Sequence, residues 1–145
     1  MPEEQDESLN ALFGTVARRL RHSSIKALAP WQVTPSQLRV MSLIDMHEAI
    51  RPSELADHLH ISPRSVTEVV DSLEQRGLVR RDSDPDDRRA SLISLTGEGA
   101  ALSDAVRAAR AAEAETVFGR LSARDRAGLR RILRKLANSY EDGTG

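Results

Sequence analysis

Two prolines, Pro52 and Pro63, each stand at the start of a short stretch in which apolar residues recur at helical spacing. The short distance along the chain between these two stretches limits the fold more than any other feature. The first stretch covers residues 53–59, and its apolar side is formed by Leu55, Ala56 and Leu59. Only a few residues around Ile61 and Ser62 separate it from the second stretch. Two short helices joined by so tight a turn are typical of a helix-turn-helix.

The second stretch, residues 62–76, has complete start and stop signals for a helix. Ser62 is a good N-cap, Pro63 suits the first helical position, and Gly77 suits a left-handed C-cap. One stripe of the predicted helix is apolar and consists of Val66, Val69, Val70 and Leu73. The opposite face presents Arg64, Ser65, Thr67, Glu68 and Asp71. We therefore expect one buried side and one polar, solvent-facing side.

A charge-rich loop follows, flanked by strand candidates at 78–81 and 90–95. Its charged residues are Asp84, Asp86, Asp87, Arg88 and Arg89. The pattern predicts a β-hairpin directly after the helix-turn-helix, which makes a winged helix-turn-helix. The major groove of B-DNA accepts one α-helix, and a hairpin beside it can reach the neighbouring backbone or the minor groove.

Further helices are predicted on both sides of this unit. Amphipathic spacing indicates helices over residues 8–28 and 96–118, and another from about Ser122 to residue 140. The motif VTPSQL (33–38) starts a further helix with a capping box from Thr34 and Gln37. The fold class is mainly α, with about six helices and one hairpin between the fourth and fifth. The apolar seams of the end helices exceed what a small winged unit needs, so they either close a monomeric bundle or join two chains.

Composition narrows the function classes. The 145 residues fit one domain, with the winged part at about 33–96 and the end helices at 8–29 and 97–140. The absence of cysteine excludes disulfides and thiolate metal clusters and fits a reducing cytoplasm. No apolar run reaches the roughly 20 residues that span a bilayer, so we expect no membrane contact. We expect no metal or cofactor and no enzymatic activity, because no metal-ligand pair, phosphate loop or activated nucleophile is recognisable.

The predicted polar helix face offers groups that can read nucleic acid. Near the helix start, which begins with Ser62 and Pro63, Arg64 can pair with guanine or phosphate, and Ser65 and Thr67 with phosphate or base edges. Glu68 can accept from cytosine or merely orient Arg64. The alternative is an ordinary exposed helix face. Residues 60–92 carry six bases and seven acids, so we expect only modest non-specific affinity per chain.

These features together resemble the MarR family of transcriptional regulators over essentially the whole chain. The residues that carry the resemblance are VTPSQLRVMSLI (33–44), RPSELADHLHISPRSVTEVVDSLEQRGLV (51–79) and DPDDRRASLISLTGEG (84–99). The resemblance implies a homodimer held by the end helices and a repressor that binds a palindromic double-stranded DNA operator. It also implies that Arg89, next to Arg88, enters the minor groove while Asp87 holds its guanidinium.

Carboxylates repel phosphates, so those on a loop that faces DNA must pair with cations or point away from the DNA. We expect Arg88 or Arg89 to pair with one of the loop carboxylates, and Arg80 or Arg81 to pair with the others. In a dimer the two reading helices would lie about 34 Å apart, one turn of the duplex. An inverted-repeat operator and a steep salt dependence follow.

Many members of this family bind small anionic aromatic compounds, and Arg18, His22 and Trp31 are candidates for such a crevice. The competing interpretation makes Trp31 a packed anchor and Arg18 a surface ion-pair partner. A DNA-binding factor of the same fold without an effector is an alternative function. A helical module whose hairpin binds protein is another. The lack of cysteine excludes sensing by thiol oxidation.

Overall fold

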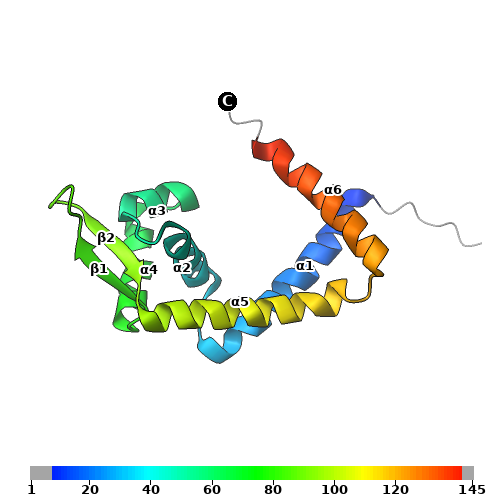
Figure 1. Cartoon of the computed structure of the whole chain (residues 1–145), viewed down its shortest axis with the longest axis horizontal. Coiled ribbons are helices and arrows are strands. Elements are labelled where there is room, and N and C mark those ends of the chain that lie inside the picture. The colour runs from blue at the N-terminus through cyan, green and yellow to red at the C-terminus, as the bar shows by residue number, and fades with distance from the viewer. Residues whose placement is uncertain (1–7, 142–145) are drawn as a thin grey trace, which may run out of the picture. The chain divides into compact units, whose positions relative to one another are not determined.

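The computed structural model describes residues 8–141 and is mainly helical (Figure 1). Its elements are α1 (Leu9–Leu28), a 3-10 turn (Ala29–Trp31), α2 (Pro35–His47), α3 (Pro52–Leu59), α4 (Pro63–Gln75), β1 (Val79–Ser83), β2 (Ser91–Leu95), α5 (Gly97–Phe118) and α6 (Ala123–Glu141). The predicted fold class, with six helices and one hairpin, is confirmed. The chain divides into two compact units. Residues Ser24–Arg110 form one unit, and the two chain ends, up to Ser23 and from Ala111, form the other.

The central unit is built around one apolar core that α2, α3, α4 and the hairpin share. Its most deeply buried side chains are Val40, Met41, Ile44, Ile50, Leu55, Val66, Val70, Leu73 and Ile93. Burying these branched side chains removes apolar area from water, which stabilises the unit by about 25 cal/mol per Å². The apolar stripe predicted for α4 is inside, with Val69 only partly covered.

Helix α2 begins as the sequence predicts. Thr34 Oγ1 accepts from the Gln37 backbone N–H at 3.1 Å, and Gln37 Oε1 accepts from the Thr34 N–H at 3.0 Å. The flanking residues Val33 and Leu38 are both buried in one cluster, as a hydrophobic staple requires. The Gln37 side chain also donates to Ser72 Oγ on α4 at 2.9 Å, so the start of α2 is tied to α4.

The helix-turn-helix is confirmed, with one boundary shifted. Helix α3 begins at Pro52 and not at residue 53, because proline itself occupies the first helical position after the N-cap Arg51. His60 adopts a left-handed conformation (φ 53°) and ends α3. Ser62 caps α4, and Gly77 (φ 72°) follows its end, as expected for a residue without a Cβ.

The hairpin is longer on its first strand than predicted. Strand β1 runs to Ser83, which pairs with Ser91 in an antiparallel register that continues to Val79 opposite Leu95. Strand β2 begins at Ser91, one residue later than predicted. The extension arises because polar residues at the end of β1 still find partners on β2, which hydrophobic patterning alone does not reveal. Ile50 adds a bridge to Ile93, with N–H···O distances of 3.0 and 2.9 Å.

The segment from Leu95 to Gly99, with the sequence LTGEG, forms the joint between the hairpin and α5. Thr96 Oγ1 donates to the Gly77 carbonyl at 2.6 Å and accepts from the Gly99 N–H at 3.1 Å. Thr96 therefore caps α5, which begins at Gly97 and not at the threonine itself. A Cβ at Gly99 would collide with the Leu78 carbonyl oxygen. This joint explains why a threonine and a glycine stand at these positions.

A second, smaller core lies beside the first within the central unit. It consists of Leu28, Val33, Leu38 and Val106, with Trp31 and Leu102 packed against it. Helix α5 thus contributes Val106 to a core that also contains the end of α1 and the start of α2. The 3-10 turn that joins these two helices was not predicted from the sequence.

The unit formed by the chain ends leaves much apolar surface uncovered in this single chain. Leu9 is 85% exposed, Phe13 63% and Leu136 54%. Within this unit, Arg126 at the start of α6 donates to both carboxylate oxygens of Glu115, at 3.2 and 2.9 Å. None of the helices between residues 8 and 141 combines the length and the apolar character needed to cross a membrane.

Candidate nucleic-acid interface

The polar face predicted for α4 lies open to solvent at the start of the helix. The Arg64 side chain is 90% exposed and the Glu68 side chain 71% exposed, and Arg64 Nε lies 3.6 Å from Glu68 Oε1. This spacing of four residues places them on adjacent turns of one face. Glu68 thus lies within ion-pair distance of Arg64, and its role, to accept from cytosine or to orient Arg64, stays a prediction.

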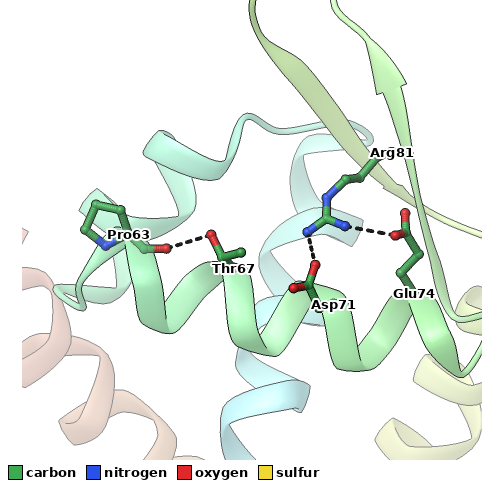
Figure 2. A network of polar contacts seen from close by, with 5 residues as sticks. All are labelled: Pro63, Thr67, Asp71, Glu74 and Arg81. Atoms are coloured by element: carbon green, nitrogen blue, oxygen red, sulfur yellow. Dashed lines mark hydrogen bonds and ion pairs between the residues drawn. The ribbon is translucent and has the colours of Figure 1, made fainter.

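The hydroxyl groups at this helix start are partly engaged with the helix itself. Ser62 Oγ accepts from the Ser65 N–H at 3.1 Å and lies 2.9 Å from Ser65 Oγ. Thr67 Oγ1 donates to the Pro63 carbonyl at 3.0 Å (Figure 2), and the same hydroxyl oxygen can still accept a hydrogen bond. Helix α4 thus presents a helix N-terminus with its own cap, an exposed guanidinium and hydroxyl oxygens on one surface.

Arg81 on β1 joins the hairpin to α4 (Figure 2). Its guanidinium donates to Asp71 Oδ1 at 2.5 Å and to Glu74 Oε1 at 2.8 Å. The hydrogen bond to Asp71 is the main reason that the pKa of Arg81 is raised above its ordinary value. The expectation that Arg81 would pair with the loop carboxylates is wrong. Its guanidinium pairs instead with two carboxylates on α4, those of Asp71 and Glu74.

The loop carboxylate Asp84 is also neutralised by an unexpected partner. Its side chain is only 5% exposed, and its Oδ2 accepts from Arg51 Nε at 2.8 Å and lies 2.5 Å from Arg51 Nη2. Its Oδ1 accepts from the Asp86 N–H at 2.9 Å. The backbone bond from Asp86, followed by Arg51, lowers the pKa of Asp84. Arg80, the other expected partner, pairs with Asp82 at 3.1 Å.

The tip of the hairpin is organised around Asp87, although not in the predicted way. Asp87 Oδ1 accepts from the backbone N–H of Arg89 at 3.0 Å, and the Asp87 carbonyl accepts from the Ala90 N–H at 3.0 Å. The carboxylate therefore shapes the turn and does not hold the Arg89 guanidinium in the free chain. Across residues 8–141, Arg88 and Arg89 form no ion pair, and both are exposed.

Ion pairs give most of the acids around α4 and the hairpin a cationic partner. Of the seven acids between residues 60 and 92, five form ion pairs: Glu68, Asp71, Glu74, Asp82 and Asp84. One partner, Arg51, lies outside that range: it precedes α3 as its N-cap residue and pairs with Asp84 of the hairpin. Among the described residues the two remaining acids, Asp86 and Asp87, lie at the hairpin tip beside Arg88 and Arg89, so the tip exposes two charges of each sign.

Sequence reasoning missed Arg51. It is separated from Asp84 by 33 positions and has no local pattern that announces a partner. The one available signal was its place at the N-cap of a proline-led helix, where a side chain that cannot cap is free to turn elsewhere. Arg76 was missed as well, and it donates to the Trp31 and Gln32 carbonyls at 2.7 and 3.0 Å.

The candidate ligand residues fall into two places. Arg18 and His22 line a cavity of about 460 Å³ together with Arg19, Ser23, Thr116, Val117 and Arg120. Trp31 belongs to the other compact unit and packs against the core of Leu28 and Val33. Packing of Trp31 agrees with the interpretation of this residue as an anchor. Arg18 donates to Thr15 Oγ1 at 3.3 Å.

Comparison with known proteins shows which protein family has this fold and sequence pattern. The sequence model of the MarR family matches residues 33–91, which cover the helix-turn-helix and most of the hairpin. The HTH-type transcriptional repressor MdtR of Bacillus subtilis is 31% identical over 92% of this chain and 84% of its own length. The chain belongs to the MarR family. The HTH-type transcriptional repressor NicR of Pseudomonas putida is also 31% identical, over 84% of this chain and 78% of its own length.

The fold agrees with solved structures of MarR itself. A MarR variant from E. coli, crystallised with operator DNA, superposes with a TM-score of 0.70 and 27% identity. The superposition covers 88% of this chain and 92% of the MarR chain. The MarR-type winged helix-turn-helix predicted from the sequence is therefore confirmed as the fold.

Proposed function

We propose that this chain is a transcriptional regulator that binds double-stranded DNA sequence-specifically and acts as a repressor. The observation that carries the proposal is the pairing of two features on one unit. The start of α4 exposes Arg64 beside hydroxyl groups, and the tip of the hairpin tied to the same helix exposes the guanidinium groups of Arg88 and Arg89. The names of the relatives MdtR and NicR, both repressors, and the operator complex of MarR support it.

Each part of the interface receives a role from its chemistry. Helix α4 enters the major groove, where Arg64 donates to guanine or phosphate and the oxygens of Ser65 and Thr67 meet base edges or phosphates. The helix start at Ser62 and Pro63 favours a nearby phosphate, since the positive end of the helix dipole lies there. Arg89, with Arg88 beside it, enters the minor groove, whose negative potential is strongest where A·T pairs narrow it.

The acting form is a homodimer, and the end helices supply its interface. Side chains such as Leu9, Phe13, Ile132 and Leu136 remain exposed in the single chain. Apolar faces of this extent on α1 and α6 are costly in water unless another surface covers them. A second copy of the chain presents the same faces and covers them by symmetry. Two copies of α4 then read two half-sites of an inverted repeat.

A small anionic effector is the proposed signal for release. The cavity between α1 and the end of α5 contains three arginines and His22, with Val117 as an apolar wall. These groups suit a carboxylate on a compact aromatic body. The measurement is thermal unfolding of the protein with a panel of aromatic carboxylates, followed by DNA binding. A carboxylate that raises the melting temperature and weakens DNA binding supports the effector role, and no shift with any of them contradicts it.

The experiment that tests DNA binding compares two duplexes. One contains the intact palindrome, and the other contains the same palindrome with one half-site scrambled. The protein first selects a palindrome from genomic fragments, and fluorescence anisotropy then measures its affinity at several salt concentrations. We expect scrambling one half-site to weaken binding strongly, and log K to fall steeply with log salt. Equal binding to both duplexes contradicts a dimer that reads a palindrome, and the absence of any selected fragment contradicts the function itself.

A further inference from the structure

Two consecutive residues, Ile50 and Arg51, hold the hairpin from the side of α3. Ile50 exchanges two backbone hydrogen bonds with Ile93 on β2, at 3.0 and 2.9 Å. Arg51 then reaches the far end of the hairpin and pairs with Asp84, where β1 has just ended. The short segment before α3 is therefore attached both to the middle of the sheet and to the start of its tip.

Asp84 is the point at which this attachment meets the wing tip (residues 84–90). Its backbone N–H donates to the Ala90 carbonyl at 3.1 Å and closes the tip. One carboxylate oxygen accepts from the Asp86 N–H inside the tip, and the other accepts from Arg51 outside it. The Asp84 side chain is 5% exposed, whereas the side chain of Arg51 is 37% exposed. Asp84 thus links the turn that carries Arg88 and Arg89 to the helix-turn-helix.

We propose that Arg51 is a positioning residue of the wing, which acts through Asp84 to fix where Arg88 and Arg89 stand relative to α4. This inference rests on the proposed function, because it concerns how the wing reaches the minor groove. Arg51 itself need not touch the nucleic acid. The assignment gives a function to a residue outside the loop and outside the reading helix, at the start of α3.

The physical reason lies in the weakness of an isolated hairpin. Two strands without further support are marginally stable in water, so their tip samples many orientations. An arginine on such a tip pays an ordering cost whenever it enters a groove. The charge-assisted bonds from Arg51 remove much of that freedom before binding. Loss of Arg51 would also leave the buried Asp84 carboxylate without its cation, which disfavours the observed arrangement of the tip.

Two other roles for Arg51 make different predictions. A direct contact with phosphate would lower affinity independently of the wing, since Arg51 is partly exposed. A purely structural role would lower stability and leave the affinity of the folded protein unchanged. A double-mutant cycle separates these three, because only residues that act through one another show non-additive effects.

The cycle combines Arg51→Met with Arg89→Ala in the full-length protein, at a temperature where all variants are folded. We expect each single change to weaken binding to the selected palindrome by roughly 5- to 100-fold, the range of one groove contact. The double variant should bind about as weakly as the weaker of the two single variants, because both changes remove the same contact of the wing with the minor groove. Multiplied effects of the two changes would overturn the proposal in favour of a direct contact.

Further variants sharpen the assignment. Asp84→Asn keeps the shape of the side chain but removes its charge, so it should weaken binding in the same direction and be non-additive with Arg51→Met. Arg51→Lys keeps the cation and should recover part of the lost affinity. Arg107→Met is the matched control, since Arg107 also forms an ion pair, with Asp45 at 2.9 Å, but on α5 and away from the wing. It should bind as the wild type does.

The outcome for the wild type keeps this inference distinct from the proposed function. If the wild type selects no DNA, the proposed function fails and the inference fails with it. If the wild type binds a palindrome and Arg51→Met binds equally well, only the inference is overturned. Hydroxyl-radical footprints add an independent reading, because loss of wing placement should restore cleavage at the minor groove flanking each half-site and leave major-groove contacts protected.

Discussion

Arg81 Nη2 lies 2.5 Å from Asp71 Oδ1, and this contact joins the first strand of the wing to the exposed side of α4. The same guanidinium reaches Glu74, so one cation serves two carboxylates one turn apart. The wing and α4 are thereby connected by side chains as well as by the short chain between them. The contact also offsets part of the negative charge of these two acids, which would otherwise repel phosphates more strongly.

Replacing Arg81 with methionine should weaken both stability and DNA binding. The change keeps much of the apolar stem and removes the ion pairs, so we expect a loss of about 0.5–1.5 kcal/mol in the free energy of unfolding. DNA affinity should fall because the loss of the Arg81 cation makes the charge near the duplex one unit more negative. Urea unfolding and anisotropy measure the two effects. Arg39→Met, an exposed change on α2, is the control, and an equal response of both variants would contradict this role.

The joint after the hairpin predicts opposite effects for two glycines. Gly99→Ala places a methyl group against the Leu78 carbonyl and should cost at least about 2 kcal/mol of unfolding free energy. Gly97→Ala meets no atom within 4 Å and has an ordinary φ, so it should be neutral or stabilise the protein by about 0.4–1 kcal/mol. Chemical denaturation of both variants provides the measurement. Similar values for the two would show that the Thr96 joint is not closely packed.

The ion pair of Asp84 predicts a specific dependence of stability on pH. Its pKa in the folded protein is lowered below the unfolded value of about 3.9, so the unfolded state binds more protons as pH falls through this range. The contribution of Asp84 is therefore present above about pH 4 and is lost as pH falls towards the folded pKa. The difference in unfolding free energy between wild type and Asp84→Asn should shrink across that window. A difference independent of pH would contradict the assignment.

The exposed apolar face of α6 predicts how the proposed dimer can be broken. Leu136→Glu should raise the dissociation constant of the dimer at least about tenfold, because a carboxylate would be buried against an apolar partner. Asn138→Glu adds the same charge two residues away, which is a different face of the helix, and should leave assembly unchanged. Sedimentation velocity over a range of concentrations measures both. A stable dimer of Leu136→Glu would place the interface elsewhere.

The elements of the fold could be predicted because their signals are local. The Thr34–Gln37 capping box, the proline at the start of α4 and the left-handed Gly77 all lie within a few residues of the structure that they cause. The apolar stripe of α4 follows from helical periodicity in the same way. The end of β1 was predicted two residues too early, because its last residues are polar and depend on their partners across the hairpin.

The partners of charged side chains could not be predicted in the same way. Arg51 and Asp84 are far apart in the sequence, and only the folded hairpin brings them together. Proximity along the chain favoured Arg80 and Arg81 as partners of the loop carboxylates, but strand pleating turns Arg81 towards Asp71 on α4. The DNA contacts, the effector residues and the single-domain organisation stay predictions.

The central claim, that α4 and the hairpin tip of two chains read one duplex, is tested most directly by selection from a random pool. Purified protein is incubated with duplexes of random sequence at physiological salt, and bound molecules are sequenced after several rounds. We predict enrichment of an inverted repeat whose half-sites lie about 10 base pairs apart, and loss of the flanking A·T preference with Arg89→Ala. A pool without enrichment, or a motif without twofold symmetry, would contradict the account.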